Sequence, residues 1–100
     1  MTPDQLRAIM EYLRERVRCE TETAGTEPTI VFDAPSVADM VQSGLDPEGA
    51  RQILEAEWWD EMVEDIVDTP AMCDPEDSSQ EVLAFAKDVV SEYIRKRASL

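Results

Sequence analysis

Residues 47–68 read PEGARQILEAEWWDEMVEDIVD, and this stretch predicts the longest helix of the chain. Asp46 is a favourable N-cap and Pro47 suits the first turn, so we expect the helix to cover residues 47–67. The pair at 69–70, Thr-Pro, is expected to end it, because a residue before proline avoids helical backbone angles. The stretch therefore predicts one long amphipathic helix at the centre of a small helical domain.

The polar side of this predicted helix is almost purely negative. At about 100° per residue, its carboxylates fall on one arc and apolar side chains occupy the rest. Such a face either keeps a protein soluble or docks a basic partner through its charge. We call this set the acidic arc: Glu57, Asp60, Glu61, Glu64, Asp65 and Asp68.

Two tryptophans, Trp58 and Trp59, are adjacent and would point about 100° apart on a helix. Either both are buried because the helix is flanked on two sides, or one belongs to the core and the other to an interface. Because tryptophan is enriched at binding hot spots, an apolar stripe that includes Trp59 is the candidate anchor for a partner. The candidate partner-binding site is therefore the acidic arc together with Trp59.

The charge balance of the whole chain limits its partners. The 100 residues include 23 Asp and Glu against 9 Lys and Arg, with no His and a formal net charge of −14. Between residues 29 and 78, fourteen acidic side chains stand against a single basic one, Arg51. Nucleic acid and anionic membrane surfaces are not expected as partners, because affinity for them comes from Lys and Arg.

Three further helices are predicted, over residues 3–22, 33–44 and 79–97, with an acidic loop over residues 71–77 before the last one. In the last helix seven apolar side chains are expected to face inward: Val82, Phe85, Ala86, Val89, Val90, Tyr93 and Ile94.

Residues 29–32 read TIVF, which is typical of a strand. No second strand candidate is found in the chain, and an isolated strand leaves its backbone groups unpaired. We therefore expect an extended segment that would become a strand only by pairing across a dimer. The predicted fold is all-α: a small bundle of three to four helices with one short extended segment near residues 29–32, in a single domain of residues 1–100.

Residues 37–67 resemble the first two helices of a ubiquitin-associated (UBA-type) three-helix module. The resemblance is carried by the turn SGLDPE at residues 43–48 and by Ala50, Ile53 and Leu54. It implies a short helix that meets a glycine turn forming part of a binding patch. The chain departs from the family after Ala56, where a polar loop gives way to EWWD. Helix-turn-helix DNA readers share the same pattern, so we interpret the segment as a generic helical hairpin.

An enzymatic alternative rests on Glu61 and Glu64, which a helix places on neighbouring turns where carboxylates suit Mg²⁺ or Mn²⁺. This Glu-x-x-Glu spacing resembles half of the motif of the all-α nucleoside triphosphate pyrophosphatases, which would make the chain a metal-dependent hydrolase. The second half of that motif, a Glu-x-x-Asp helix, is missing from the sequence. Without His, neither Cys19 nor Cys73 has the usual partner of a catalytic nucleophile.

We therefore expect a small, acidic, non-catalytic protein that acts through protein–protein interaction, as an adaptor, regulator or inhibitor that binds a basic surface. The alternatives are the Mg²⁺- or Mn²⁺-dependent hydrolase and a nucleic-acid mimic. No cofactor, nucleic acid or membrane is expected. The N-terminus lacks the pattern of a signal peptide, so a cytoplasmic location is expected, and a homodimer is left open.

Overall fold

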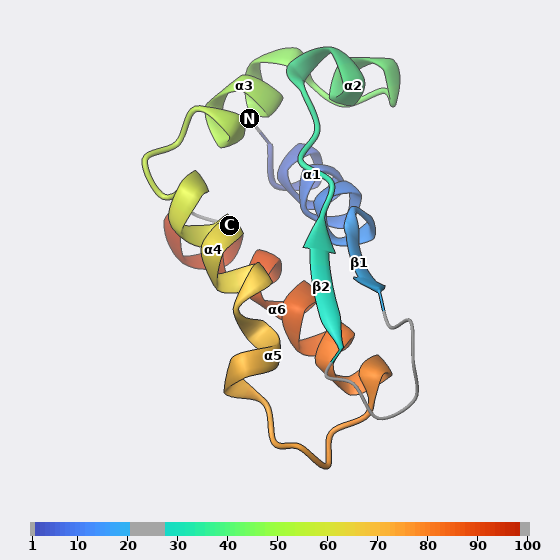
Figure 1. Cartoon of the computed structure of the whole chain (residues 1–100). Coiled ribbons are helices and arrows are strands. Elements are labelled where there is room, and N and C mark those ends of the chain that lie inside the picture. Colours follow the sequence, from blue (N-terminus) through green and yellow to red (C-terminus); the bar gives the residue numbers. More distant parts are fainter. Residues whose placement is uncertain (1, 21–27, 99–100) are drawn as a thin grey trace.

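The computed structural model describes residues 2–20 and 28–98, over which the chain forms six helices and two short strands (Figure 1). In chain order these are α1 (Pro3–Glu15), β1 (Val17–Glu20), β2 (Thr29–Phe32), α2 (Val37–Gln42), α3 (Pro47–Leu54), α4 (Trp59–Val67), α5 (Thr69–Met72) and α6 (Ser79–Arg97).

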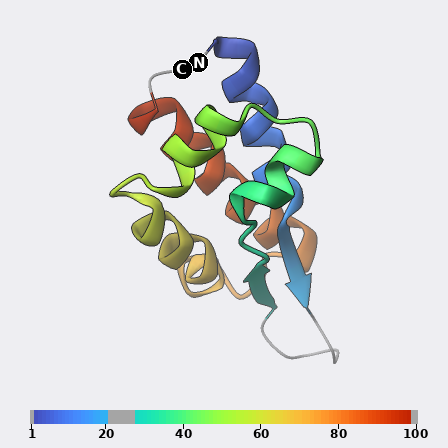
Figure 2. The ribbon, with the colours of Figure 1, turned by 90° about the horizontal axis from the view of Figure 1, so that it is seen from above.

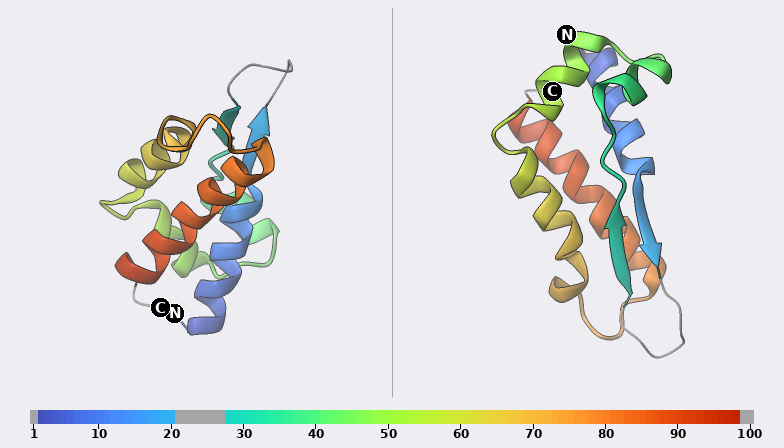
Figure 3. Two further views of the ribbon diagram at one scale, coloured as in Figure 1. Left: turned by 90° about the horizontal axis from the view of Figure 1, so that it is seen from below. Right: turned by 45° about the horizontal axis from the view of Figure 1, so that its top comes forward.

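Helix α6 lies between α1 on one side and α4 on the other (Figure 3). Its side chains at every fourth position are fully covered, so a single stripe of α6 faces the core. This stripe meets the buried residues of α1 and α4. The residues concerned are Val82, Ala86, Val90 and Ile94 of α6, Leu6, Ile9 and Leu13 of α1, and Met62 and Ile66 of α4.

The helix starts follow the expected capping chemistry. Thr2 and Gln5 form a reciprocal capping box at α1, with the Gln5 amide donating to the Thr2 hydroxyl over 3.1 Å. Asp46 accepts from the Gly49 amide at α3 over 2.8 Å. Ser78 likewise accepts from the Glu81 amide at α6. Local sequence therefore determines where these helices begin.

The predicted single helix over residues 47–67 is wrong, because the chain turns between Leu54 and Trp59 and forms two helices, α3 and α4. Ile53 of α3 and Met62 of α4 are both buried. Nine positions separate them, so on one straight helix they would point about 180° apart. The turn lets α3 pack against α1 and α2 while α4 packs against α6. Helices α2 and α3 thus lie across one end of the molecule (Figure 2).

The expectation of an unpaired extended segment at residues 29–32 is also wrong. These residues form β2, which pairs antiparallel with β1 of the same chain in the register Val17 to Phe32 and Cys19 to Ile30. Strand β1 covers residues that were predicted to belong to the first helix. That helix ends at Glu15 instead of continuing to residue 22. Val17 is buried in the strand, and a continued helix would also place it on the apolar stripe of Leu6, Ile9 and Leu13, so hydrophobic spacing alone does not separate the two conformations. Pairing across a dimer is not needed to satisfy this strand.

Helix α4 ends just before the Thr69-Pro70 pair, as expected. The same pair begins α5, a single helical turn that extends into the region predicted to be a loop. Proline is compatible with a first helical turn, where its missing amide hydrogen has no intrahelical acceptor. A mostly helical small fold is therefore confirmed. A bundle is not supported specifically, because a two-stranded sheet and short helices share the core with α1, α4 and α6.

Arg18 of β1 ties the strand to Asp33, the residue after β2. Its Nε donates to Asp33 Oδ2 over 2.5 Å and its Nη2 donates to Oδ1 over 3.1 Å. These hydrogen bonds, with the adjacent positive charge, hold the pKa of Asp33 below its ordinary value. The stabilisation is present above the unfolded-state pKa and is lost as the pH falls through the lower folded-state pKa.

We predict that Asp33→Asn lowers the melting temperature at neutral pH and that the difference from wild type closes below about pH 4. Thermal unfolding of both proteins across this pH range measures it. A difference that stays constant into acid would contradict a contribution from the ionised Asp33.

Candidate functional site

The acidic arc lies mainly along the outer side of α4, with its carboxylates fanned over an open surface. Asp60, Glu61 and Glu64 are exposed on the helix, and Asp68 is exposed where the helix ends. Glu57 is exposed too, but it lies in the turn between α3 and α4, so the arc is not one continuous helical face. Asp65 is half-buried against α6.

The acidic arc carries no internal counter-charge among the residues that the structure describes. The salt bridges there join Arg7 to Asp4, Arg14 to Asp88, Arg18 to Glu20 and Asp33, and Lys96 to Glu92. None of these involves a carboxylate of the arc. The basic residues at the end of α6 therefore leave the arc's negative charge uncompensated by direct ion pairs.

The two tryptophans both have aromatic partners within the chain. Trp59 is half-buried, and its ring lies 5.7 Å from that of Phe32 on β2. Trp58 is also half-buried, with its ring 6.0 Å from that of Tyr93 on α6. Trp59 thus joins α4 to the sheet, and this contact occupies part of the side chain that the sequence offers as a partner anchor.

One member of the acidic arc connects α4 to α6. The Tyr93 hydroxyl donates a hydrogen bond to the Asp65 carboxylate, and the Arg97 guanidinium lies 5.9 Å from the centre of the Tyr93 ring. Burial and the hydrogen bond to Asp65, together with the charges of Asp65 and Glu61, raise the pKa of the Tyr93 hydroxyl well above its ordinary value. Asp65 therefore has a positioning role in addition to its charge.

Beside this contact, α5, the following loop and α6 enclose a groove of about 520 Å³, which we call the α5–α6 groove. Its apolar wall comes from Met72, Phe85 and Val89. Met72 is 81% exposed and Phe85 is 47% exposed, values that are high for side chains of this size and type. The acidic side chains that line the groove are Asp65, Asp74, Asp77 and Glu92, and no Lys or Arg lines it among the described residues.

The sequence suggested these groove residues but assigned them to the core. The inward-facing set predicted for the last helix combines two stripes, and only the stripe of Val82, Ala86, Val90 and Ile94 is buried. The second stripe, with Phe85, Val89 and Tyr93 four residues apart, borders the groove instead. The expectation that Phe85 faces inward is therefore wrong. The signal in the sequence was that the last helix carries two apolar stripes. A domain with few other helices has enough packing partners to cover only one of them fully.

Cys73, half-buried in the same groove, is chemically quiet. Burial raises the pKa of its thiol, and the charges of Asp77 and Asp74 raise it further. A thiol that stays protonated at neutral pH is a poor nucleophile. The groove is thus suited to contact and not to covalent chemistry at this cysteine.

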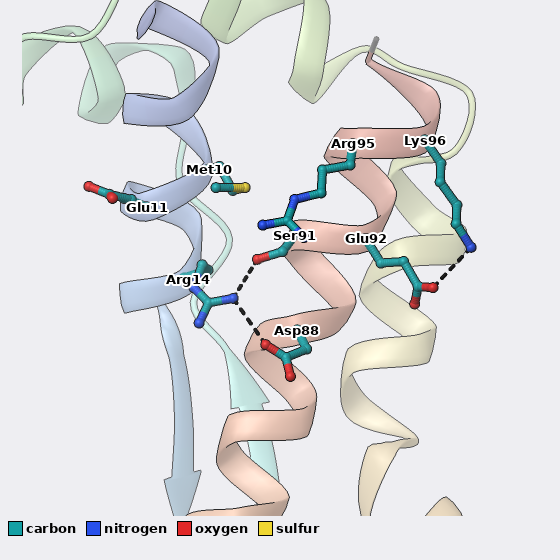
Figure 4. A pocket seen from close by; sticks show the side chains of 8 residues that line it. All are labelled: Met10, Glu11, Arg14, Asp88, Ser91, Glu92, Arg95 and Lys96. Atoms are coloured by element: carbon teal, nitrogen blue, oxygen red, sulfur yellow. Dashed lines mark hydrogen bonds and ion pairs between the residues drawn. The ribbon is translucent and has the colours of Figure 1, made fainter. Parts of the chain in front are cut away.

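A second groove, of about 720 Å³, runs between α1 and α6 (Figure 4). Its charged groups largely satisfy one another. Arg14 donates to the Lys87 carbonyl oxygen over 3.0 Å, to Asp88 over 3.3 Å and to the buried Ser91 hydroxyl. Lys96 donates to Glu92 over 2.9 Å. The α1–α6 groove therefore contains both cations and anions, whereas the charged side chains that line the α5–α6 groove are all acidic among the described residues. Glu92 lines both grooves and is paired with Lys96.

Two features are absent from the described residues, 2–20 and 28–98. No group of three or more Cys, Asp or Glu side chains among them is arranged to hold a metal ion, and Glu61 and Glu64 belong to no such group. None of the helices in this part of the chain is long and apolar enough to cross a membrane. Comparison of the chain with protein-family models, curated proteins and solved structures finds no match.

We predict that Tyr93→Phe lowers the free energy of unfolding by about 1 kcal/mol, because the half-buried Asp65 loses its donor. Urea unfolding measures this, with Tyr12→Phe on α1 as the control.

The wild type should also lose stability above about pH 10, because Tyr93 ionises there in the unfolded chain while it keeps its proton in the folded protein. The Tyr93→Phe variant should lose less, and identical alkaline profiles would contradict the role assigned to Tyr93.

Proposed function

We propose that this protein is a small, non-catalytic binding protein that docks a basic surface of another protein through the acidic arc. The observation that carries the proposal is that Asp60, Glu61, Glu64 and Asp68 are exposed on one side of α4 and form no ion pair with any other described residue. Adaptor, regulator and inhibitor roles all fit this mode of action. The low number of cysteines, two in 100 residues, fits our further proposal that the protein acts in the cytoplasm.

The physical mechanism is electrostatic steering followed by short-range contact. Fourteen carboxylates and a single basic residue lie between residues 29 and 78, so this region carries most of the net charge of −14. A field of one sign increases the association rate with a partner of opposite charge and rejects partners of like charge. Carboxylates that already have a counter-ion would add little to this field. Those of the acidic arc retain their full effect.

The test compares three immobilised baits: the wild type, a Glu61→Gln/Glu64→Gln variant and a Glu11→Gln/Glu15→Gln variant. Both pairs lie exposed on helices and remove the same charge, so the second variant is a matched control. Proteins captured from a lysate of the source cells at low and at high salt are quantified by mass spectrometry. We expect the wild type and the control to retain basic proteins at low salt. The Glu61→Gln/Glu64→Gln variant should retain less of them, and high salt should release them from every bait.

Equal retention by all three baits at both salt concentrations would contradict the proposal. The identity of the captured proteins decides whether the special case of nucleic-acid mimicry applies. A mimic would capture proteins that bind DNA or RNA, and added nucleic acid would displace them. If the Glu61→Gln/Glu64→Gln variant fails to retain the basic proteins and added nucleic acid does not displace them from the wild type, ordinary protein docking is favoured.

A further inference from the structure

We propose that the α5–α6 groove binds a large apolar side chain presented by a Lys- or Arg-rich segment of the partner. This inference deepens the proposed function and rests on it, because the acidic arc would bring the basic segment to α4 and the groove would hold it there. Asp65 belongs to both features, so the arc and the groove form one continuous surface at the α4–α6 boundary.

The groove has the composition of an anchoring site. Its volume of about 520 Å³ is in the range of sites that hold small ligands, so it has room for one large side chain. Met72 is 81% exposed on the one-turn helix α5, and Phe85 is 47% exposed on α6. Removing large apolar side chains from water lowers the free energy in proportion to the area covered. A partner's apolar group that covered both Met72 and Phe85 would therefore stabilise the complex. Methionine also adapts its shape to different partners.

Charge decides which kind of apolar segment fits. Asp74 and Asp77 come from the loop after α5, and the Asp74 amide donates to Asp77 Oδ2 over 3.0 Å, which fixes both residues at the groove. Asp65 lies at the α4 side. Since no basic side chain among the described residues lines the groove, an acidic or neutral segment would leave these carboxylates without counter-charge. A basic segment would supply the missing counter-charge.

A second copy of this chain is a poor occupant. Each copy carries a net charge of −14, so two copies repel one another over most of their surfaces. The two contacts that could have favoured a homodimer are also made within one chain: β2 pairs with β1, and Trp59 packs against Phe32. The charge of the groove instead matches a different, basic protein.

The test uses two synthetic Lys-rich peptides that are identical except for one central position, Phe in the first and Ala in the second. Binding of each dye-labelled peptide is followed by fluorescence anisotropy. We expect the Phe peptide to bind the wild type about tenfold more tightly than the Ala peptide, because only the Phe ring enters the groove. When each peptide is present at a saturating concentration, Cys73 should also react more slowly with an alkylating reagent in the Phe complex than in the Ala complex, because the two peptides carry the same charge and only the Phe ring covers the groove that Cys73 lines.

A Met72→Ala/Phe85→Ala variant should lose this tenfold preference, and both of its changes are at exposed positions that leave the core intact. Val41→Ala, at an exposed apolar position on α2, is the matched control and should keep the preference. Circular dichroism and thermal melting verify that each variant is folded.

The two proposals fail in different ways. If both peptides bind equally and the Glu61→Gln/Glu64→Gln change weakens both, the arc acts without the groove, and the inference about the groove is overturned. If the Phe preference persists in the Met72→Ala/Phe85→Ala variant, the apolar contact lies elsewhere and the inference is again overturned. If neither peptide binds more tightly than an uncharged peptide of the same length, the proposed function fails together with the inference.

Discussion

The buried stripe of α6 is the contact on which the rest of the molecule depends. Val82, Ala86, Val90 and Ile94 are almost fully buried, and α1, α4 and β1 all pack against this helix. Because one helix separates two packing partners, it also creates two grooves with different chemistry. On the α1 side Arg14 reaches over α6 and neutralises the carboxylate it meets. On the α4 and α5 side Lys96 pairs with Glu92, but Asp65, Asp74 and Asp77 form no ion pair among the described residues, so their negative charge remains available to a partner.

The turn between α3 and α4 determines which side chains are available for binding. If residues 47–67 formed one straight helix, Ile53 and Met62 would point to opposite sides of it and could not face the same core. Breaking the helix lets each half bury its own apolar face, and α4 then directs its acidic side outward. The same turn places Trp58 against Tyr93 and Trp59 against Phe32. The tryptophans therefore stabilise the position of α4, while Met72 and Phe85 are the more exposed large apolar side chains beside it.

Local chemistry was readable from the sequence, whereas long-range pairing was not. Asp46 caps α3 as its position in the sequence predicts, and Thr2, Ser36 and Ser78 cap helices by the same chemistry, because each cap involves residues only three apart. The pairing of Val17 with Phe32 joins residues fifteen positions apart. Because Val17 lies four residues after Leu13, its spacing also fits a continued helix, and the pattern does not reveal the strand. The acidic arc follows from composition and periodicity alone. The α5–α6 groove does not, because it depends on which of two apolar stripes of α6 the other helices cover.

The binding surface that we propose is the acidic side formed by α4, α5 and the Phe85–Tyr93 stripe of α6. Backbone amide NMR spectra recorded during titration with the Lys-rich Phe peptide test this claim most directly. We predict that the resonances that shift belong to α4, α5, the loop that holds Asp74 and Asp77, and the exposed stripe of α6. Shifts concentrated instead in the α1–α6 groove around Arg14, or spread evenly over the chain, would contradict it.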